Sequence, residues 1–141
     1  MPVLFTREND FAIRICAYLA GKTPGEHISV STLSQRLFIT RPFATKIIYK
    51  LKTKNIIDTV QGKSGGVFLK VDPEQLSLFD ILEATEFDSH LNECLKLNTI
   101  CPLEKKCGIH HFFLEKEEDL FHSLKEKKIS EFKIIDPELS L

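Results

Sequence analysis

The stretch that decides the fold is Phe38-Ile-Thr-Arg-Pro-Phe-Ala-Thr-Lys-Ile-Ile-Tyr-Lys-Leu-Lys-Thr-Lys54, which predicts a tight corner followed by a basic helix. Thr40 suits the N-cap, and Pro42 suits the first turn because its missing N–H costs nothing there. An apolar stripe recurs at i, i+4 and i+8, so one face of a helix over about residues 41–54 is buried. The stripe is Phe43, Ile47 and Leu51, with Ile48 beside it. The outward face carries Arg41, Thr45, Lys46, Tyr49 and Lys50.

Two further helices are expected upstream of this corner. The first begins at the N-cap Thr6 and ends at Gly21. The second is short and is capped by Ser29 or Ser31. Its inward residues are Val30, Leu33 and Leu37. Two short helices that meet at a tight corner, the second with a basic free face, are typical of a helix-turn-helix.

A β-hairpin is expected directly after the basic helix. Residues 56–60 and 67–71 are predicted as strands, and Gln61-Gly-Lys-Ser-Gly-Gly66 as a glycine-rich turn between them. A hairpin in this place is a wing. Its glycines let the backbone approach another surface closely, and Lys63 and Ser64 at the tip suit contact with phosphate or the minor groove.

The charge distribution along the chain indicates a polyanionic partner. Although the net charge of the whole chain is −1, residues 36–70 carry eight basic side chains and one acidic side chain, a net charge of +7. Residues 71–141 carry eight basic and 16 acidic side chains, a net charge of −8. A lysine run is most often only a solvated face, but this one coincides with the helix-corner-helix-hairpin pattern. We therefore predict that the chain binds double-stranded DNA.

The predicted DNA contacts fall into three groups. The side chains placed to read base edges are Arg41, Thr45, Lys46 and Tyr49, near the start of the basic helix. Lys50 and Lys52 lie farther along and are expected to contact phosphates, and Lys63 and Ser64 contact DNA from the wing. Winged helices sometimes bind proteins instead, so the fold alone does not decide the partner.

The second half of the chain is predicted to be mostly helical. Ser77 and Asp80 form a capping-box pattern for a helix that runs to about residue 86. A long helix with a wide apolar face begins near Pro102 or Gly108 and runs to about residue 128. The remaining residues, 129–141, are expected to form a short strand or a poorly ordered tail.

The predicted fold class is mainly α with a small β-hairpin. We expect a winged helix-turn-helix DNA-binding domain over residues 1–75. Residues 76–141 then hold a sensor loop at about 88–107 and a dimerisation helix at about 102–128. No stretch reaches the roughly 20 apolar residues that span a bilayer, and the N-terminus lacks a signal-peptide pattern, so we expect a cytoplasmic protein without membrane contact. No nucleophile–base pair or phosphate loop suggests an enzyme.

Three of the four cysteines, Cys94, Cys101 and Cys107, fall in one polar segment with the spacing C-x6-C-x5-C. Cys16 instead lies among apolar residues of the first helix and is expected to be buried. Zinc usually takes closer pairs of cysteines, and a thiol switch needs only one or two. Loops of this width can also fold around an iron–sulfur cluster, whose irons bind thiolates. The spacing leaves these possibilities open.

A cluster with three cysteines needs a fourth ligand. His110 and Asp10 are the candidates, although surface or capping roles are common for either residue type. Four apolar residues of the segment are expected to exclude water from a cluster: Leu95, Leu97, Ile100 and Leu103.

Four stretches together carry a resemblance to a known family. They are Phe5-Thr-Arg-Glu-Asn-Asp-Phe-Ala-Ile-Arg14, Gly62-Lys-Ser-Gly-Gly-Val-Phe-Leu69, Leu76-Ser-Leu-Phe-Asp-Ile-Leu-Glu-Ala84 and the three spaced cysteines. In these stretches the chain resembles the Rrf family of bacterial winged-helix regulators. The resemblance implies a homodimer paired through the long C-terminal helix, an iron–sulfur cluster held by Cys94, Cys101 and Cys107, and cluster-dependent binding to a palindromic operator. It implies a transcription regulator, such as a repressor, that senses redox stress, nitric oxide or iron–sulfur status.

Members of that family differ in the fourth ligand. In NsrR-like members an Asp on the first helix of the other subunit completes a 4Fe-4S site, and the matching residue here is Asp10, with Arg14 also matching. In IscR-like members a His three residues after the last cysteine completes a 2Fe-2S site, and the match here is His110. The run Asp10-Phe-Ala-Ile-Arg14 favours the NsrR-like arrangement. The chain departs from the family at Phe38, where Gly is common, and at Arg41-Pro42.

Two other functions stay open at this point. The chain could be a cluster-free, thiol-based regulator, or a protein-binding adaptor with a winged-helix fold. Iron and sulfide in anaerobically purified protein would favour the cluster, and colourless protein after anaerobic reconstitution would exclude it.

Overall fold

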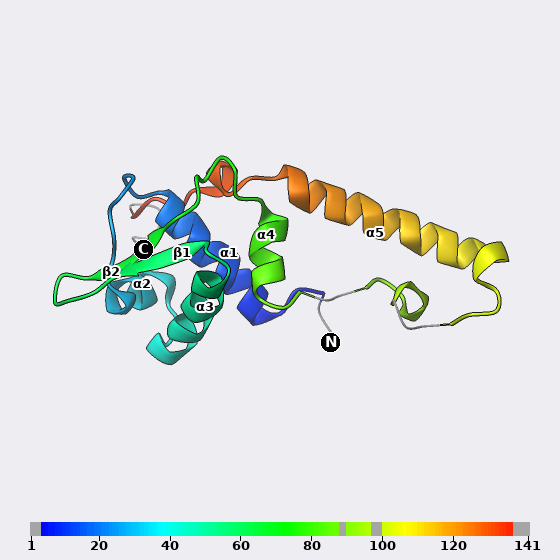
Figure 1. The fold of residues 1–141 in the computed structure, drawn as a ribbon, viewed down its shortest axis with the longest axis horizontal. Helices are drawn as coiled ribbons and strands as arrows, with labels where there is room; N and C mark the ends of the chain where they lie inside the picture. The colour runs from blue at the N-terminus through cyan, green and yellow to red at the C-terminus, as the bar shows by residue number, and fades with distance from the viewer. Residues whose placement is uncertain (1–3, 88–89, 97–99, 137–141) are drawn as a thin grey trace.

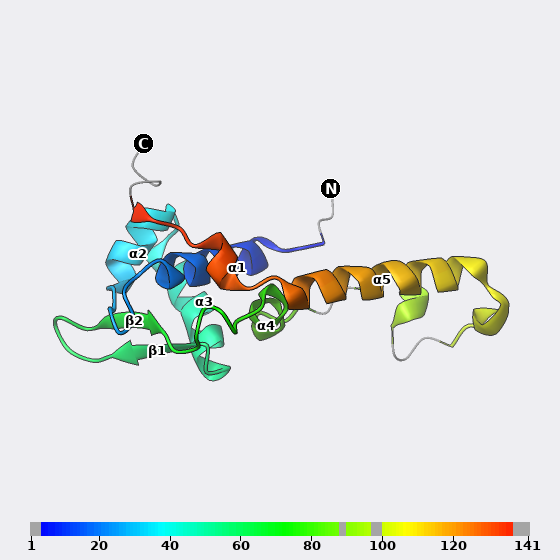
Figure 2. The same cartoon turned by 90° about the horizontal axis from the view of Figure 1, so that it is seen from above.

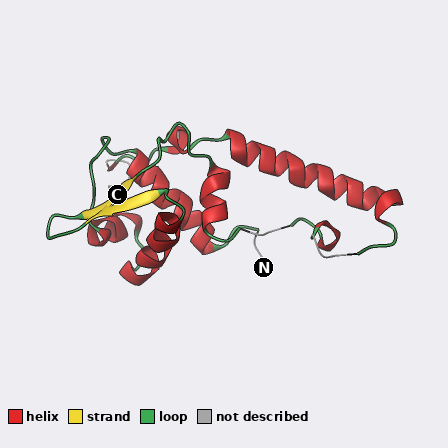
Figure 3. Ribbon diagram, viewed as in Figure 1, coloured by secondary structure: helices red, strands yellow, loops and turns green. Residues whose placement is uncertain are grey.

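A computed structural model describes residues 4–87, 90–96 and 100–136 of the chain. Figure 1 shows two parts, a bundle of short helices with a hairpin and a long helix that projects from it. The helices are α1 (Arg7–Ala20), α2 (Val30–Leu37), α3 (Arg41–Thr53), α4 (Leu78–Ala84) and α5 (Gly108–Glu126). The strands are β1 (Ile57–Val60) and β2 (Gly66–Leu69), and the short 3-10 turns are η1 (Glu93–Leu95), η2 (Glu104–Lys106) and η3 (Ile129–Phe132). The predicted mainly α fold with a small hairpin is confirmed (Figure 3).

The helix boundaries follow from local capping. Thr6 and Thr40 cap α1 and α3 as predicted, and Ser29 rather than Ser31 caps α2. The α2–α3 corner forms at Phe38, which adopts a left-handed conformation with φ 57° and ψ 42°. Helix α3 ends before Asn55, which has φ 60° and turns the chain into β1.

The wing is an antiparallel pair of strands. Ile57 pairs with Leu69 and Val60 pairs with Gly66. Ile28, just before α2, bridges to Val67 on the far side of β2. A Cβ on Gly66 would lie 2.2 Å from the Ile28 carbonyl oxygen, so this position requires glycine. The surface that the wing glycine approaches is therefore the chain's own Ile28 segment.

One hydrophobic core joins the helices and the wing. Its fully buried members include Ile15, Leu33, Ile47 and Leu51, which are the inward residues of the first three helices. Val67 extends this core into β2. The arrangement leaves one face of α3 outside the core, beside the wing (Figure 1).

The C-terminal segment docks on α1, so the expectation of a strand or poorly ordered tail over residues 129–136 is wrong. Residues 129–132 form η3, and Ile129 is fully buried. The Ile134 amide donates to the Ala17 carbonyl at 3.1 Å, and Asp136 accepts from the Tyr18 hydroxyl at 2.7 Å and the Lys22 amine at 2.6 Å. Apolar and ionic contacts with α1 thus order a segment whose own sequence pattern is weak. The rest of the predicted tail, residues 137–141, lies outside the described residues.

Helix α5 begins at Gly108, one of the two predicted starts, and projects from the bundle. Figure 2 shows the preceding segment running beside α5 before it turns into the helix. Within the described residues, no helix combines the length and apolar content needed to cross a membrane. Parts of the predicted sensor loop, residues 88–89 and 97–99, lie outside the described residues.

Candidate nucleic-acid interface and metal centre

The outer face of α3 carries the side chains predicted to read DNA. Arg41 and Thr45 are exposed in its first turns, and Tyr49 is 71% exposed. Ala44 and Ile47 on the opposite face are buried completely, which fixes the rotation of the helix. The outward orientation predicted from the apolar stripe is confirmed for Arg41, Thr45 and Tyr49, whereas Lys50, predicted on the same face, is only partly exposed because it turns toward Glu8.

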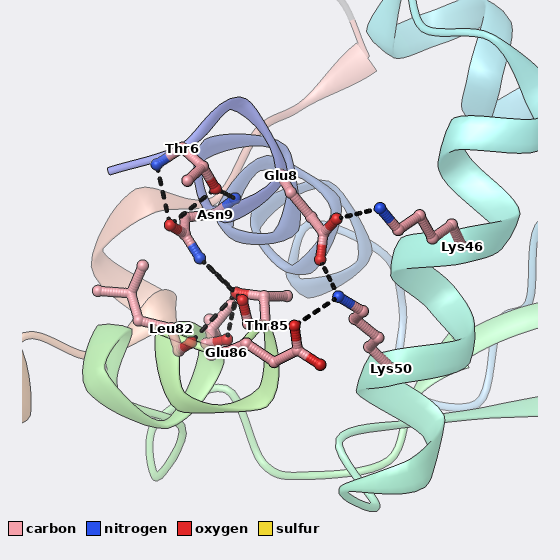
Figure 4. Close-up of polar contacts among 9 residues, drawn as sticks. Thr6, Glu8, Asn9, Lys46, Lys50, Leu82, Thr85 and Glu86 are labelled. Atoms are coloured by element: carbon pink, nitrogen blue, oxygen red, sulfur yellow. Dashed lines mark hydrogen bonds and ion pairs between the residues drawn. The ribbon is translucent and has the colours of Figure 1, made fainter. Parts of the chain in front are cut away.

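Lys46 and Lys50 also lie on α3, but their amines are paired within the protein. Lys50 lies 2.5 Å from Glu8 Oε1 and 3.4 Å from Glu86 Oε2, and Lys46 lies 2.8 Å from Glu8 Oε2 (Figure 4). Hydrogen bonding to Glu8 raises the pKa of Lys50. Burial alone would raise the pKa of Glu8, but the two lysines outweigh it and hold that pKa below its ordinary value.

The wing tip presents Lys63 and Ser64 to solvent, as predicted. His27 supports this tip, because its Nε2 lies 2.6 Å from the Ser64 carbonyl oxygen. Since a carbonyl oxygen only accepts, Nε2 is the donor. Lys52 donates to the Thr59 hydroxyl at 2.9 Å, which ties the end of α3 to β1.

Asp10 lies at the surface of α1, where it accepts a hydrogen bond from Arg14 Nε at 2.9 Å. Both side chains are more than half exposed. Helix α1 belongs to the bundle, whereas the cysteine segment runs along α5 away from it (Figures 1 and 2). Within one chain, the Asp10 carboxylate is thus exposed on the bundle and does not face the cysteine segment of the same chain.

Two of the three spaced cysteines, Cys94 and Cys107, lie at the start of α5. Cys94 lies in η1, Cys101 in the loop and Cys107 at the N-cap of α5, and all three are partly buried. His110, in the first turn of α5, is buried, and its Nδ1 lies 3.3 Å from Cys94 Sγ. The chain thus brings one cysteine and the candidate histidine together.

Two of the residues expected to exclude water from the cysteines do not do so in the single chain. Ile100 is 94% exposed and Leu103 is 67% exposed. The reason is the position of the loop, which lies along α5 and outside the core. Leu97 lies outside the described residues.

The donor set suits an iron–sulfur cluster, since cysteine thiolates are its usual ligands and imidazole replaces thiolate in some clusters. Among the described residues, no three His, Cys, Asp or Glu side chains are grouped closely enough to hold a metal ion. The ligands thus fit by type and not by their arrangement in one chain. Cys16 is separate: it is fully buried, burial raises the pKa of its thiol far above the ordinary value, and its predicted place in the core is confirmed.

Sequence reasoning missed several polar residues that organise the interface. Asn9 is buried, and its Nδ2 donates to the Thr85 carbonyl at 3.2 Å and hydroxyl at 2.8 Å. Asn9 also completes a capping box with Thr6, a spacing that is visible in the sequence. The Glu8 pairs and the His27 contact join residues at least 37 positions apart and leave no local signal.

A helix-turn-helix followed by a wing is the architecture of winged-helix transcription regulators. The chain belongs to the Rrf2 family, described as "Iron-dependent Transcriptional regulator", whose family model matches residues 5–133. The resemblance seen in the four sequence stretches is thereby confirmed. The expectation that the chain is not an enzyme is confirmed as well, because its relatives are transcription regulators.

Relatives and solved structures agree with this family. The chain is 29% identical to the HTH-type transcriptional regulator NsrR of Bacillus subtilis over 111 residues, covering 78% of this chain and 76% of that protein. The fold matches T. potens IscR with a TM-score of 0.69 at 16% identity, over 92% of this chain and 84% of the other. It matches CymR, the global cysteine regulator of B. subtilis, with a TM-score of 0.75 at 14% identity, over 95% and 100%.

Proposed function

We propose that this transcription regulator binds duplex DNA by placing α3 in the major groove and the β1–β2 wing against the backbone. The observation that carries the proposal is the exposed polar face of α3 directly beside the wing. The proposed base-reading residues are Arg41, Thr45, Lys46 and Tyr49. The proposed phosphate contacts are Lys50, Lys52, Lys63 and Ser64, with Lys50 at the inner edge next to Glu8.

Salt dependence and sequence preference separate these roles. Lys63→Ala should weaken binding to every duplex and lower the salt slope by about 0.9, the value for one lost phosphate contact. Arg41→Ala should instead relax sequence preference in a selection from random duplexes. Lys133→Ala is the matched control, because Lys133 is exposed in the segment after η3. Variants at Lys63 and Arg41 that both behave like the control would contradict the docking.

We propose that two copies pair through α5. The first turns of this helix expose apolar side chains, with Ile109 64% and Phe112 53% exposed, next to Ile100 and Leu103. Exposed apolar residues gathered on one segment are typical of an interface. A homodimer would place two α3 helices on the two half-sites of a palindromic operator.

We propose that Cys94, Cys101 and Cys107 hold an iron–sulfur cluster, with Asp10 of the partner subunit as fourth ligand and a 4Fe-4S cluster favoured. His110, with a 2Fe-2S cluster, is the alternative. The family description as iron-dependent and the NsrR relative support a metal cofactor. A bound cluster supplies a group that reacts with oxidants or nitric oxide. The protein would transmit the state of the cluster through its own contacts. Ligation by the cysteines ties their loop to α5. Ligation by Asp10 acts on α1 two residues from Glu8, and Glu8 is paired with Lys50 of α3.

The ligand assignment has matched controls on α5. Anaerobically purified protein should be brown and contain iron and sulfide. Asp10→Ala should alter the cluster spectrum, whereas Asp119→Ala should not. His110→Ala is paired with His122→Ala in the same way. Loss of the spectrum in His110→Ala together with no change in Asp10→Ala would overturn the assignment to Asp10, and colourless reconstituted protein would overturn the cluster.

The second candidate function is cluster-free regulation through a thiol. The 3.3 Å approach of His110 Nδ1 to Cys94 Sγ favours it, because it holds a hydrogen-bonding imidazole beside a partly buried free thiol. Reversible, peroxide-dependent DNA binding by iron-free protein that is lost in Cys94→Ser would support this function over the cluster.

A further inference from the structure

Two lysines of the proposed reading helix are held by a single carboxylate of the same chain. The two oxygens of Glu8 take one lysine each, Lys46 at 2.8 Å and Lys50 at 2.5 Å. Figure 4 shows Glu8 at the start of α1 reaching across to α3, where both lysines point toward it. Lys46 and Lys50 lie four residues apart, so they occupy adjacent turns on one side of α3.

The Glu8 carboxylate is fixed in place by the elements around it. The Glu8 side chain is only 15% exposed. Its neighbour Asn9 is buried and anchors the first turn of α1 to Thr85 at the end of α4. Glu86, next to Thr85, adds a second carboxylate 3.4 Å from Lys50. Moving the first turn of α1, which carries Glu8, away from α3 would therefore require breaking the α1–α4 contact.

The Glu8 carboxylate binds one lysine with each oxygen, and these are the charged groups that could otherwise bind a DNA phosphate. Sequence-independent affinity depends on how many lysines neutralise phosphates, and each contact steepens the salt slope by about 0.9. Specificity is the ratio of operator binding to sequence-independent binding. Internal pairing of lysines raises that ratio when operator binding rests largely on base contacts and sequence-independent binding rests on phosphate contacts. The Lys50 side chain is 22% exposed and the Lys46 side chain 60%, so Lys46 is the more accessible of the two lysines.

We propose that Glu8 is a specificity-determining residue. On arbitrary sequence, where Lys46 has no matching base edge to read, Glu8 competes with DNA phosphate for Lys46 and Lys50 and so suppresses sequence-independent binding. The proposal rests on the proposed docking of α3 on DNA. Glu8 acts through the two lysines and makes no DNA contact itself. Its loss should therefore tighten binding to arbitrary sequence, which is the opposite of what a purely structural role produces.

The test compares Glu8→Gln with the unsubstituted protein on a duplex of arbitrary sequence, across a range of salt concentrations. The variant should bind more tightly, by about tenfold at ~0.1 M salt for each lysine released, with a salt slope steeper by about 0.9 to 1.8. Its preference for a selected operator over arbitrary sequence should fall. Adding Lys46→Ala to Glu8→Gln should bring the salt slope part of the way back to that of the unsubstituted protein.

Glu74→Gln is the charge-matched control. Glu74 is exposed between β2 and α4, a segment that Figure 1 draws on the opposite side of the bundle from the start of α3. This variant should leave the slope unchanged. An equal steepening in both variants would mean that net charge alone acts, and an unchanged slope in Glu8→Gln would overturn the proposal.

A second arm does not depend on the folding of Glu8→Gln. If Lys50 is paired with Glu8 and therefore not available to a phosphate, Lys50→Ala in the otherwise unsubstituted protein should lower the salt slope less than Lys63→Ala does. Equal effects would overturn the proposal. Absence of salt-dependent DNA binding by the unsubstituted protein would overturn the proposed function and this inference with it, whereas an unchanged slope in Glu8→Gln overturns this inference alone.

Discussion

At the scale of single residues, Phe38 is the clearest departure from local preference. It sits at the α2–α3 corner with φ 57°, a conformation that favours glycine, and its side chain is 74% exposed. A left-handed residue with a Cβ costs roughly 1–2 kcal/mol, and so exposed a side chain recovers little of this cost by burial. Within the part of the chain that the structure describes, nothing in the packing accounts for a large aromatic residue here.

Phe38→Gly should therefore raise the free energy of unfolding, by about 1 kcal/mol once the added freedom of the unfolded chain is subtracted. Denaturant unfolding measures this change. Asn55→Gly is the matched control, because Asn55 has φ 60° and asparagine tolerates this conformation better than phenylalanine does. A lower stability in Phe38→Gly, or an equal gain in both variants, would contradict the strain at the corner.

At the scale of elements, two contacts made by residues outside the helix-turn-helix hold the wing and α1 in position. His27 holds the wing tip through the Ser64 carbonyl, and the C-terminal segment docks on α1 through Asp136. Both contacts join elements that are distant in sequence. The first should affect DNA binding and the second should affect stability.

His27→Ala should weaken DNA binding while leaving the helical content unchanged, because the wing loses the donor that fixes its tip. Fluorescence anisotropy with a labelled duplex measures the affinity, and circular dichroism checks the fold. His122→Ala, at an exposed position of α5, serves as the control. Unaltered affinity in His27→Ala would show that the tip is positioned without this bond.

Acid should weaken the docking of the C-terminal segment. Hydrogen bonds from Lys22 and Tyr18 hold the pKa of Asp136 below its ordinary value. A carboxyl group with a lowered folded-state pKa stabilises the fold above its unfolded pKa, and this contribution is lost as the pH falls through the folded pKa, below about pH 4. Asp136→Asn should therefore lower the melting temperature at pH 7. At pH 3 the difference in melting temperature between this variant and the unsubstituted protein should be smaller. A difference that is the same at both pH values would argue against the ion pair.

At the scale of the whole molecule, α5 carries the exposed apolar surface away from the bundle. Phe112 and Ile109 lie in its first turns, close to the cysteine segment. Pairing through this helix would cover the apolar side chains and bring the α1 helix of one copy toward the cysteines of the other. Among the residues that the structure describes, no three His, Cys, Asp or Glu side chains are grouped closely enough to hold a metal ion.

Phe112→Glu should shift the chain from dimer to monomer, because a charged side chain in the interface cannot be desolvated cheaply. Sedimentation velocity over a range of protein concentrations measures the change. Glu118→Lys, an exposed charge change on the same helix, should leave the mass unchanged. A dimer that persists in Phe112→Glu would place the interface elsewhere.

The sequence by itself determined the features that depend on nearby residues. Caps at Thr6 and Thr40, the buried stripe of α3 and the wing hairpin all arise from local hydrogen bonds and periodicity. The charge excess of the middle segment and the cysteine spacing were equally visible. These features were sufficient to indicate the family and the face of α3 that is left outside the core.

Only the tertiary structure decided how distant residues meet. The Glu8 pairs with α3, the bridge of Ile28 to β2 and the docking of Asp136 on α1 each join segments with no shared local pattern. The same holds for His110, which the fold brings to Cys94, and for Asp10, which it leaves facing outward. The physical reason is that burial and ion pairing depend on positions in space, which periodicity along one helix does not specify.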